Sequence, residues 1–178
     1  MVERTKKDIL AAFNTLIKTK DMDRITVEMI IKEAGISKAT FYRYFKDKYE
    51  VMNYNYTQLL DALSSPEHSS SYRQLYEQLY RYGRRNWQYM QKAFATVGKN
   101  SFGEYIENYS RQLVEQITQH CRDGQGLTET ERLQCDVFCN GIPYMYERWI
   151  FSNYSLTPAE AATALYELMP ATLRDLWW

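Results

Sequence analysis

The chain has 178 residues, enough for one ordinary domain or for a small domain joined to a larger one. With 45% hydrophobic and 25% charged residues, its composition is that of a globular protein and excludes a chain disordered throughout. The net charge is zero, but residues 1–60 carry a net charge of +3 and the remaining residues −3. The N-terminal part is therefore the better candidate for contact with a polyanion.

No segment approaches the ~20 consecutive apolar residues of a membrane span, and the first residues lack the hydrophobic region of a signal peptide. We expect a cytoplasmic protein without membrane contact, whose Cys121, Cys135 and Cys139 remain thiols. Cys135 and Cys139 are four residues apart, a spacing that suits a redox switch or half of a metal site. Free cysteines often simply fill a core, and no nearby His completes a metal quartet, so we predict no metal and no cofactor.

Apolar spacing predicts helices along the chain, and strand-type alternation is absent over any useful length. A first helix runs from about residue 5 to 20. Thr26 is placed to cap a short helix that ends near Ala34, Ser37 to cap a second short helix, and Asp47 to begin a longer fourth one.

A Ser-rich link at residues 64–71 separates these helices from a larger, aromatic-rich part. Capping boxes there predict the starts of four longer helices, at Ser71, Ser101, Thr128 and Thr157. Apolar positions spaced 4-3-4-4-3-4 predict one continuous helix over residues 72–94, and the last helix is expected over 157–177. The total is about eight helices in an all-α fold.

Two residues interrupt the helix expected over residues 128–152. Gly141 would permit the close approach of another helix, at a cost of ~1 kcal/mol relative to Ala. Pro143 cannot donate to the carbonyl of Cys139 and predicts a kink. The kink could open room for a pocket, and it could equally be a bend in the helix without a functional role.

The segment IIKEAGISKATFYRYFKDK, residues 30–48, combines aromatic and basic residues. Gly35 suits the left-handed backbone that ends a helix, so two short helices meet there in a helix-turn-helix. Phe41 and Phe45 are four residues apart and share the inward face of the second helix. The basic and polar residues between them are left on an outward face.

The segment TVEMIIKEAGISKATFYRYFKDKYEVM, residues 26–52, resembles the TetR family of bacterial transcription regulators. The resemblance rests on Thr26, Ala34-Gly35-Ile36-Ser37, Ala39-Thr40, the run from Phe41 to Phe45, and Lys48. Ala39 departs mildly from the pattern, since many members have Gly there. Residues 136–165 are similar to the subfamily that includes the dihydroxyacetone-kinase operon regulator, through Phe138, Gly141, Trp149 and Thr157.

The resemblance implies an N-terminal three-helix helix-turn-helix domain that binds DNA, residues 1–48. It also implies a linker helix with a helical effector-binding and dimerisation domain, residues 49–178. The candidate DNA-binding residues are Thr26, Ser37, Lys38, Ala39, Thr40, Tyr42, Arg43, Tyr44 and Lys48. Lys38 and Arg43 suit guanine edges and Ala39 a thymine methyl. The hydroxyl groups, and the helix N-termini at Thr26 and Lys48, suit phosphates.

The expected function is a repressor that binds a palindromic operator in double-stranded DNA as a homodimer held by its last two helices. A small molecule or a protein would be the effector. Candidate effector-binding residues are Tyr76, Tyr80, Gly83, Trp87, Met90, Phe94, Tyr105, Phe138 and Trp149, although plain core packing would explain the same aromatic stripe. Alternatives are an activator, a protein-controlled regulator, or an interaction module without DNA binding. An enzyme is not expected, because no catalytic triad, phosphate loop or metal quartet is identified.

Overall fold

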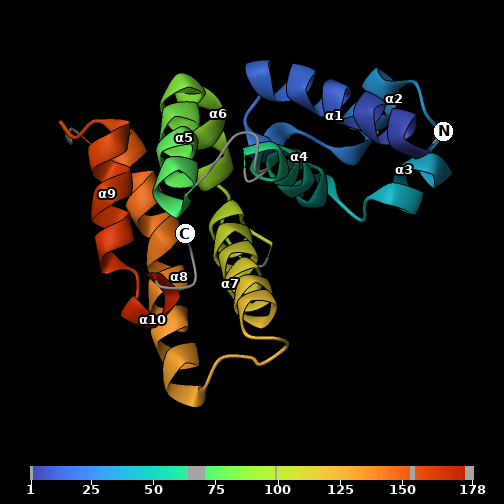
Figure 1. Cartoon of the computed structure of the whole chain (residues 1–178). Helices are drawn as coiled ribbons and strands as arrows, with labels where there is room; N and C mark the ends of the chain where they lie inside the picture. Colours follow the sequence, from blue (N-terminus) through green and yellow to red (C-terminus); the bar gives the residue numbers. More distant parts are fainter. Residues whose placement is uncertain (1, 64–70, 99, 153–154, 175–178) are drawn as a thin grey trace. The chain divides into compact units, whose positions relative to one another are not determined.

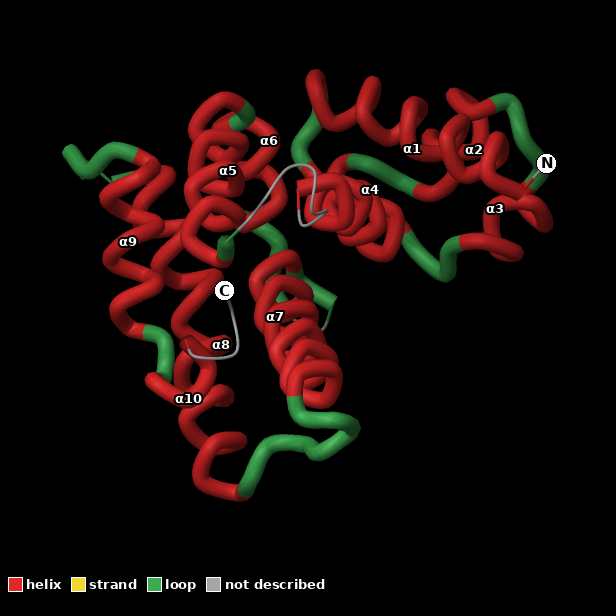
Figure 2. The backbone as a smooth tube through the Cα atoms, viewed as in Figure 1, coloured by secondary structure: helices red, strands yellow, loops and turns green. Residues whose placement is uncertain are grey.

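The computed structural model describes residues 2–63, 71–98, 100–152 and 155–174, and these contain helices and loops but no strand (Figures 1 and 2). The all-α prediction is confirmed. The helices are α1 (Val2–Thr19), the 3₁₀ helix η1 (Met22–Arg24), α2 (Val27–Ala34), α3 (Lys38–Tyr44), α4 (Lys48–Leu63), α5 (Tyr72–Arg85), α6 (Trp87–Phe94), α7 (Phe102–Cys121), α8 (Glu129–Phe151), α9 (Pro158–Leu168) and α10 (Ala171–Arg174). Most of the predicted Ser-rich link lies outside the described residues, as does the end of the helix predicted to reach residue 177.

The helices form two compact units, which we describe separately. The first consists of Met1–Leu59 and Gln88–Phe102, and the second of Leu60–Trp87 and Gly103–Trp178. Nearly all of α6 therefore belongs with the N-terminal helices. The division into functional domains at residues 48 and 49 stays a prediction.

In the first unit α1 packs against α2, and Ile9 and Phe13 of α1 are fully buried. Two polar contacts join distant segments to α1. Lys92 Nζ in α6 donates to the carbonyl oxygens of Ile17 (2.6 Å) and Lys20 (3.0 Å), which close the C-terminal end of α1. The amide groups of Asn14 and Asn55 are within hydrogen-bond distance of each other, at 3.2 Å. α6 is thus attached to α1 by charge-assisted hydrogen bonds.

In the second unit α5 packs against α9 and α8 (Figure 1). The contact between α5 and α8 is close at Gly83, where an added Cβ would lie 2.6 Å from Tyr146 Oη and 2.7 Å from Ile150 Cδ1. The Tyr146 hydroxyl donates to the carbonyl of Leu79, 2.8 Å away. A Cβ on Gly141 would meet nothing within 4 Å. Within the described chain a helix thus lies close to Gly83, whereas none lies against Gly141, and the close approach expected at Gly141 stays a prediction.

The helix predicted over residues 72–94 is wrong as a single helix. It ends at Asn86, whose backbone N–H and side-chain Nδ2 both donate to the carbonyl of Tyr82, at 2.9 and 3.0 Å. The Asn side chain competes for a backbone carbonyl of the preceding turn. This explains why the helix ends here although the apolar spacing continues. The last helix also divides, with Pro170 between α9 and α10. The described ranges consequently contain ten α-helices and η1 rather than about eight helices.

Most of the predicted helix starts are confirmed by their capping contacts. The side chains of Thr26, Ser37, Ser71, Thr128 and Thr157 each accept a hydrogen bond from the backbone N–H three residues later, and Asp47 accepts from Glu50 N. The last two threonines form complete capping boxes. A helix long and apolar enough to cross a membrane is not found in the described part of the chain.

Candidate nucleic-acid interface

The turn between α2 and α3 is built on Gly35, which adopts a left-handed backbone with φ +64°. Its N–H donates to the carbonyl of Lys32 (3.3 Å), and Ile36 N donates to the carbonyl of Ile31 (3.2 Å). This is a helix ending in which two otherwise unpaired carbonyls are satisfied. It turns the chain directly into α3, so the helix-turn-helix predicted from the sequence forms.

The two faces of α3 differ as predicted. Phe41 is fully buried and Phe45, at the end of the helix, is 2% exposed. The Phe45 ring meets the ring of Tyr54 from α4 edge-on, with centroids 5.5 Å apart. The outward face of α3 carries exposed Lys38, Ala39, Tyr42 and Arg43. The buried face of α3 is thus anchored by aromatic packing, and its exposed face carries hydrogen-bond donors and a methyl group.

Hydroxyl groups organise the N-terminal ends of α2 and α3. Exposed Thr26 accepts a hydrogen bond from Met29 N (3.3 Å), and exposed Ser37 accepts from Thr40 N (3.1 Å). The hydroxyls of Ser37 and Thr40 are also 2.8 Å apart. Tyr44, at the end of α3, is half-buried. Both helix N-termini end in exposed capping residues, and such ends favour negative charge.

Lys48 has contacts that the sequence did not indicate. Its Nζ donates to the carbonyls of Met22 (2.6 Å), Asp23 (3.3 Å) and Ile25 (2.8 Å), around the end of η1. Burial lowers the pKa of this ammonium group, while the nearby Asp23 charge opposes that shift. The side chain thus ties the start of α4 to the segment that leads into α2.

The candidate effector residues are divided between the two units. Met90 and Phe94 belong to the first unit, where the Phe94 ring packs on Phe102 with centroids 5.0 Å apart. The second unit contains Tyr76, Tyr80, Gly83, Trp87, Tyr105, Phe138 and Trp149. Among these, Trp87 is 50% exposed, and Tyr105 packs on the ring of Tyr109.

Aromatic packing surrounds Tyr80 and Trp149 in the second unit, where their ring centroids are 4.8 Å apart. Burial raises the pKa of Tyr80 to about 12. The Arg84 guanidinium lies 4.1 Å from the centroid of the Trp149 ring. The indole N–H of Trp149 donates to the carbonyl of Leu156, at 3.2 Å. These contacts are those of a packed core, and the effector role of the set stays a prediction.

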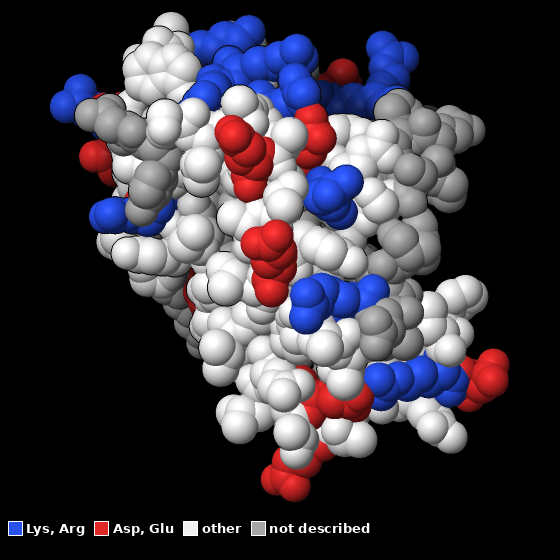
Figure 3. Space-filling model, turned by 60° about the vertical axis from the view of Figure 1, so that its left-hand side comes forward, with Lys and Arg blue, Asp and Glu red and all other residues white. Residues whose placement is uncertain are grey.

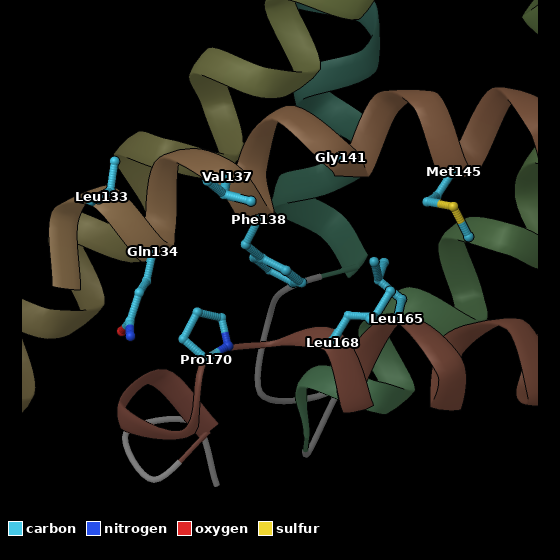
Figure 4. A pocket seen from close by; sticks show the side chains of 9 residues that line it. All are labelled: Leu133, Gln134, Val137, Phe138, Gly141, Met145, Leu165, Leu168 and Pro170. Atoms are coloured by element: carbon cyan, nitrogen blue, oxygen red, sulfur yellow. The ribbon is translucent and has the colours of Figure 1, made fainter. Parts of the chain in front are cut away.

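An apolar groove of about 510 Å³ lies between α8 and the end of α9 in the second unit (Figure 4). It is lined by Leu133, Gln134, Val137, Phe138, Gly141, Met145, Leu165, Leu168 and Pro170. Leu133, Val137 and Leu168 are 67%, 70% and 64% exposed. In Figure 3 residues other than Lys, Arg, Asp and Glu cover much of the face shown, and many of the basic side chains gather at its top. The apolar spacing in the sequence joins Leu133, Val137, Gly141 and Met145 to Trp149, but Trp149 is buried whereas the other four line the groove.

Two family comparisons cover most of the chain. The model described as "Bacterial regulatory proteins, tetR family" matches residues 9–54, which include α2, α3 and their turn. The model described as "Transcriptional regulator C-terminal region" matches residues 70–171. A comparison with curated proteins finds no significant match.

Solved structures resemble the chain over nearly its whole length. The dihydroxyacetone kinase operon activator DhaS has a TM-score of 0.60 and 21% identity, over 96% of this chain and 97% of that one. A TetR transcriptional regulator from Streptococcus agalactiae has a TM-score of 0.63 and 14% identity, over 95% and 96%. NalD, a secondary repressor of an efflux pump in Pseudomonas aeruginosa, has a TM-score of 0.51 and 17% identity, over 94% and 95%.

At these identities the solved structures support the fold, and the family models supply the function. Both models describe regulators rather than enzymes, in agreement with the expectation from the sequence. The chain belongs to the TetR family of DNA-binding transcription regulators.

Proposed function

We propose that the chain acts in the cytoplasm as a homodimer that binds a palindromic operator, with α3 of each copy in the major groove. The observation that carries the proposal is the outward face of α3, where Lys38, Ala39, Tyr42 and Arg43 are exposed on a helix anchored through Phe41. A short helix presented in this way reaches base edges in the major groove. Lys38 and Arg43 are the donors for guanine, and Ala39 is the apolar contact for thymine.

Phosphates on either side of the groove would be held by the ends of α2 and α3. Thr26 and Ser37 expose their hydroxyls beside backbone N–H groups at helix N-termini, and Tyr42 offers a third hydroxyl on a rigid ring. Such phosphate contacts would position the protein on the DNA duplex without contributing to its specificity for a DNA sequence. Lys48 contributes differently, because its ammonium group already binds three carbonyls and positions the segment before α2.

A second copy of the chain is the proposed occupant of the groove on α8 and α9. α8 is apolar on two faces, since Cys139 and Tyr146 are buried within the unit while Leu133 and Val137 are exposed. A helix with apolar residues on both faces is normally covered on both. Dimers are typical of the family, and a twofold pair of α3 helices matches a palindrome with half-sites ~34 Å apart.

An effector acting on the second unit would change operator affinity only through unequal affinity for two conformations. A small molecule and a protein both remain candidates. The prediction of repression likewise stays a prediction, because DhaS is named as an activator and NalD as a repressor.

The proposed binding is tested by selecting DNA from a random duplex library with the full-length protein at physiological salt. We expect a palindromic consensus whose two halves are about one helical turn apart. Replacing Arg43 by Ala should relax the preference at one position in each half-site, at a cost of ~1–3 kcal/mol. Replacing Tyr42 by Phe should weaken binding to every DNA sequence by about the same factor, because a lost phosphate contact does not depend on the bases. Failure to enrich any duplex would favour the interaction module without DNA binding.

Dimerisation is tested separately by sedimentation of the Val137→Glu variant. A charge at the centre of the groove should convert the dimer to a monomer. The control is Arg132→Glu, at an exposed position nearby, which should leave the dimer intact. A Val137→Glu chain that sediments as a dimer would place the interface elsewhere.

A further inference from the structure

Two cysteines form a pair inside the second unit. Cys135 and Cys139, one turn apart on α8, are 1% and 0% exposed, and their sulfur atoms are 3.7 Å apart. The hydroxyls of Tyr72 and Tyr76 from α5 contact each other and lie close enough to influence both thiols electrostatically. The third cysteine, Cys121, is exposed at the end of α7. A buried pair and an exposed single thiol thus occur in the same chain.

The geometry of the pair suits a bridging atom better than a direct disulfide. Residues four apart on a helix have Cβ atoms ~5–6 Å apart, whereas a disulfide needs about 3.5–4.5 Å. Forming the disulfide would therefore distort α8. A disulfide would also need the sulfur atoms about 2.05 Å apart, whereas one atom bonded to both sulfurs leaves them well separated, as they are at 3.7 Å here. A single soft atom would fit between the sulfurs with little change in the helix.

We propose that Cys135 and Cys139 form a two-thiol site that binds one soft metal or metalloid centre, trivalent arsenic or a soft divalent ion, between their sulfur atoms. With arsenite the step is As(OH)₃ plus two thiols, giving a dithiolate that keeps one hydroxyl, and two water molecules. With a divalent ion, two metal–sulfur bonds form and two protons are released. Neither reaction needs an oxidant or a reductant. Thiolate ligands favour such soft centres.

The two sulfur atoms are already in mutual contact, and either of them can be the hydrogen-bond donor. Arg111 from α7 favours both thiolates, although it also pairs with Asp136 (2.6 Å) and Glu107 (2.9 Å). Coordination would displace the protons of both thiols.

The test is native mass spectrometry of the full-length protein with arsenite, and in a second arm with Cd²⁺. We expect one centre per chain in the wild type and in the Cys121→Ser control, and its loss in Cys135→Ala and in Cys139→Ala. Binding in only one arm would identify the site as metalloid-selective or metal-selective. Circular dichroism of each variant shows whether it is folded. The Cys121→Ser chain keeps both pair thiols, so it tests the site even if the two alanine variants do not fold.

Three results would overturn the proposal: no adduct in either arm, an adduct that requires Cys121, or an adduct that forms only in urea. Each of these readouts is independent of DNA binding, so failure here leaves the operator proposal untouched, and failure to find an operator leaves this site untouched.

Discussion

Replacement of Lys48 by Met separates a positioning role from a phosphate contact. Met keeps the length of the side chain but removes the donor to the carbonyls of Met22, Asp23 and Ile25. Hydrogen bonds from a charged group contribute about 1.5–3 kcal/mol, and water reaches part of this half-buried site. We therefore expect a total loss of about 1.5–3 kcal/mol. At ~2–4 °C per kcal/mol for a chain of this size, the melting temperature should fall by about 3–12 °C.

The exposed neighbour Lys46 provides the matched control. Lys46→Met should change the free energy of unfolding by less than about 0.5 kcal/mol. Operator affinity is then measured against salt concentration for both variants. A lost phosphate contact lowers the slope of log K against log salt by about 0.9. The reasoning is refuted if Lys48→Met melts like the wild type, or if its salt slope falls by that amount.

Three further predictions concern the packing and the electrostatics of the second unit. Gly83→Ala should cost about 1–3 kcal/mol in urea denaturation, because the new Cβ would collide with Tyr146 and Ile150, whereas the Cβ of Gly141→Ala meets no atom of its own chain and should stabilise α8 of the monomeric Val137→Glu chain by up to ~1 kcal/mol. Equal effects of the two substitutions would contradict this packing. Arg122 and the N-terminus of α8 lower the pKa of Glu131 from 4.5 to about 2, so its contribution to stability is complete above pH 4.5 and is lost as the pH falls towards 2. Thermal melts of Glu131→Gln should accordingly show a weaker dependence on pH across that window than the wild type, and an unchanged dependence would count against the capping pair. Thr157→Ala removes the capping box of α9 and should cost about 1 kcal/mol by the same melts. Thr163→Ala, at a half-buried position inside the same helix, is the control.

The helix-turn-helix was predictable because its signals are local. Gly35 ends a helix through its own backbone, and the spacing of Phe41 and Phe45 determines which side of α3 is buried. The helix starts followed from capping residues for the same reason. The break at Asn86 was missed, because the apolar spacing continues through it and the competing hydrogen bonds involve only one polar residue.

Contacts between distant segments could not be read from the sequence. A glycine within a helix indicates that a small residue is tolerated, but not whether another helix lies against it, so the contact of α8 at Gly83 was not predicted. Lys48 was placed correctly near a helix N-terminus, yet its partners lie 23 to 26 positions earlier in the chain. The exposure of Leu133 and Val137 on α8 could likewise not be read from the sequence, because apolar spacing alone does not show which side of a helix its own chain covers.

The attachment of α6 to α1 has a practical consequence for experiments that divide the protein. Because Lys92 closes the end of α1, a fragment cut after α4 would leave the carbonyls of Ile17 and Lys20 without that cation. It would also lack Phe102, whose ring packs edge-on against Tyr56 with centroids 4.9 Å apart. The first unit is discontinuous in sequence, so a chimaera that transplants it onto another regulator needs three junctions, one near residue 59 and one at each end of residues 88–102. Exchanging residues 1–63 alone would transfer α3 without part of the first unit that supports it.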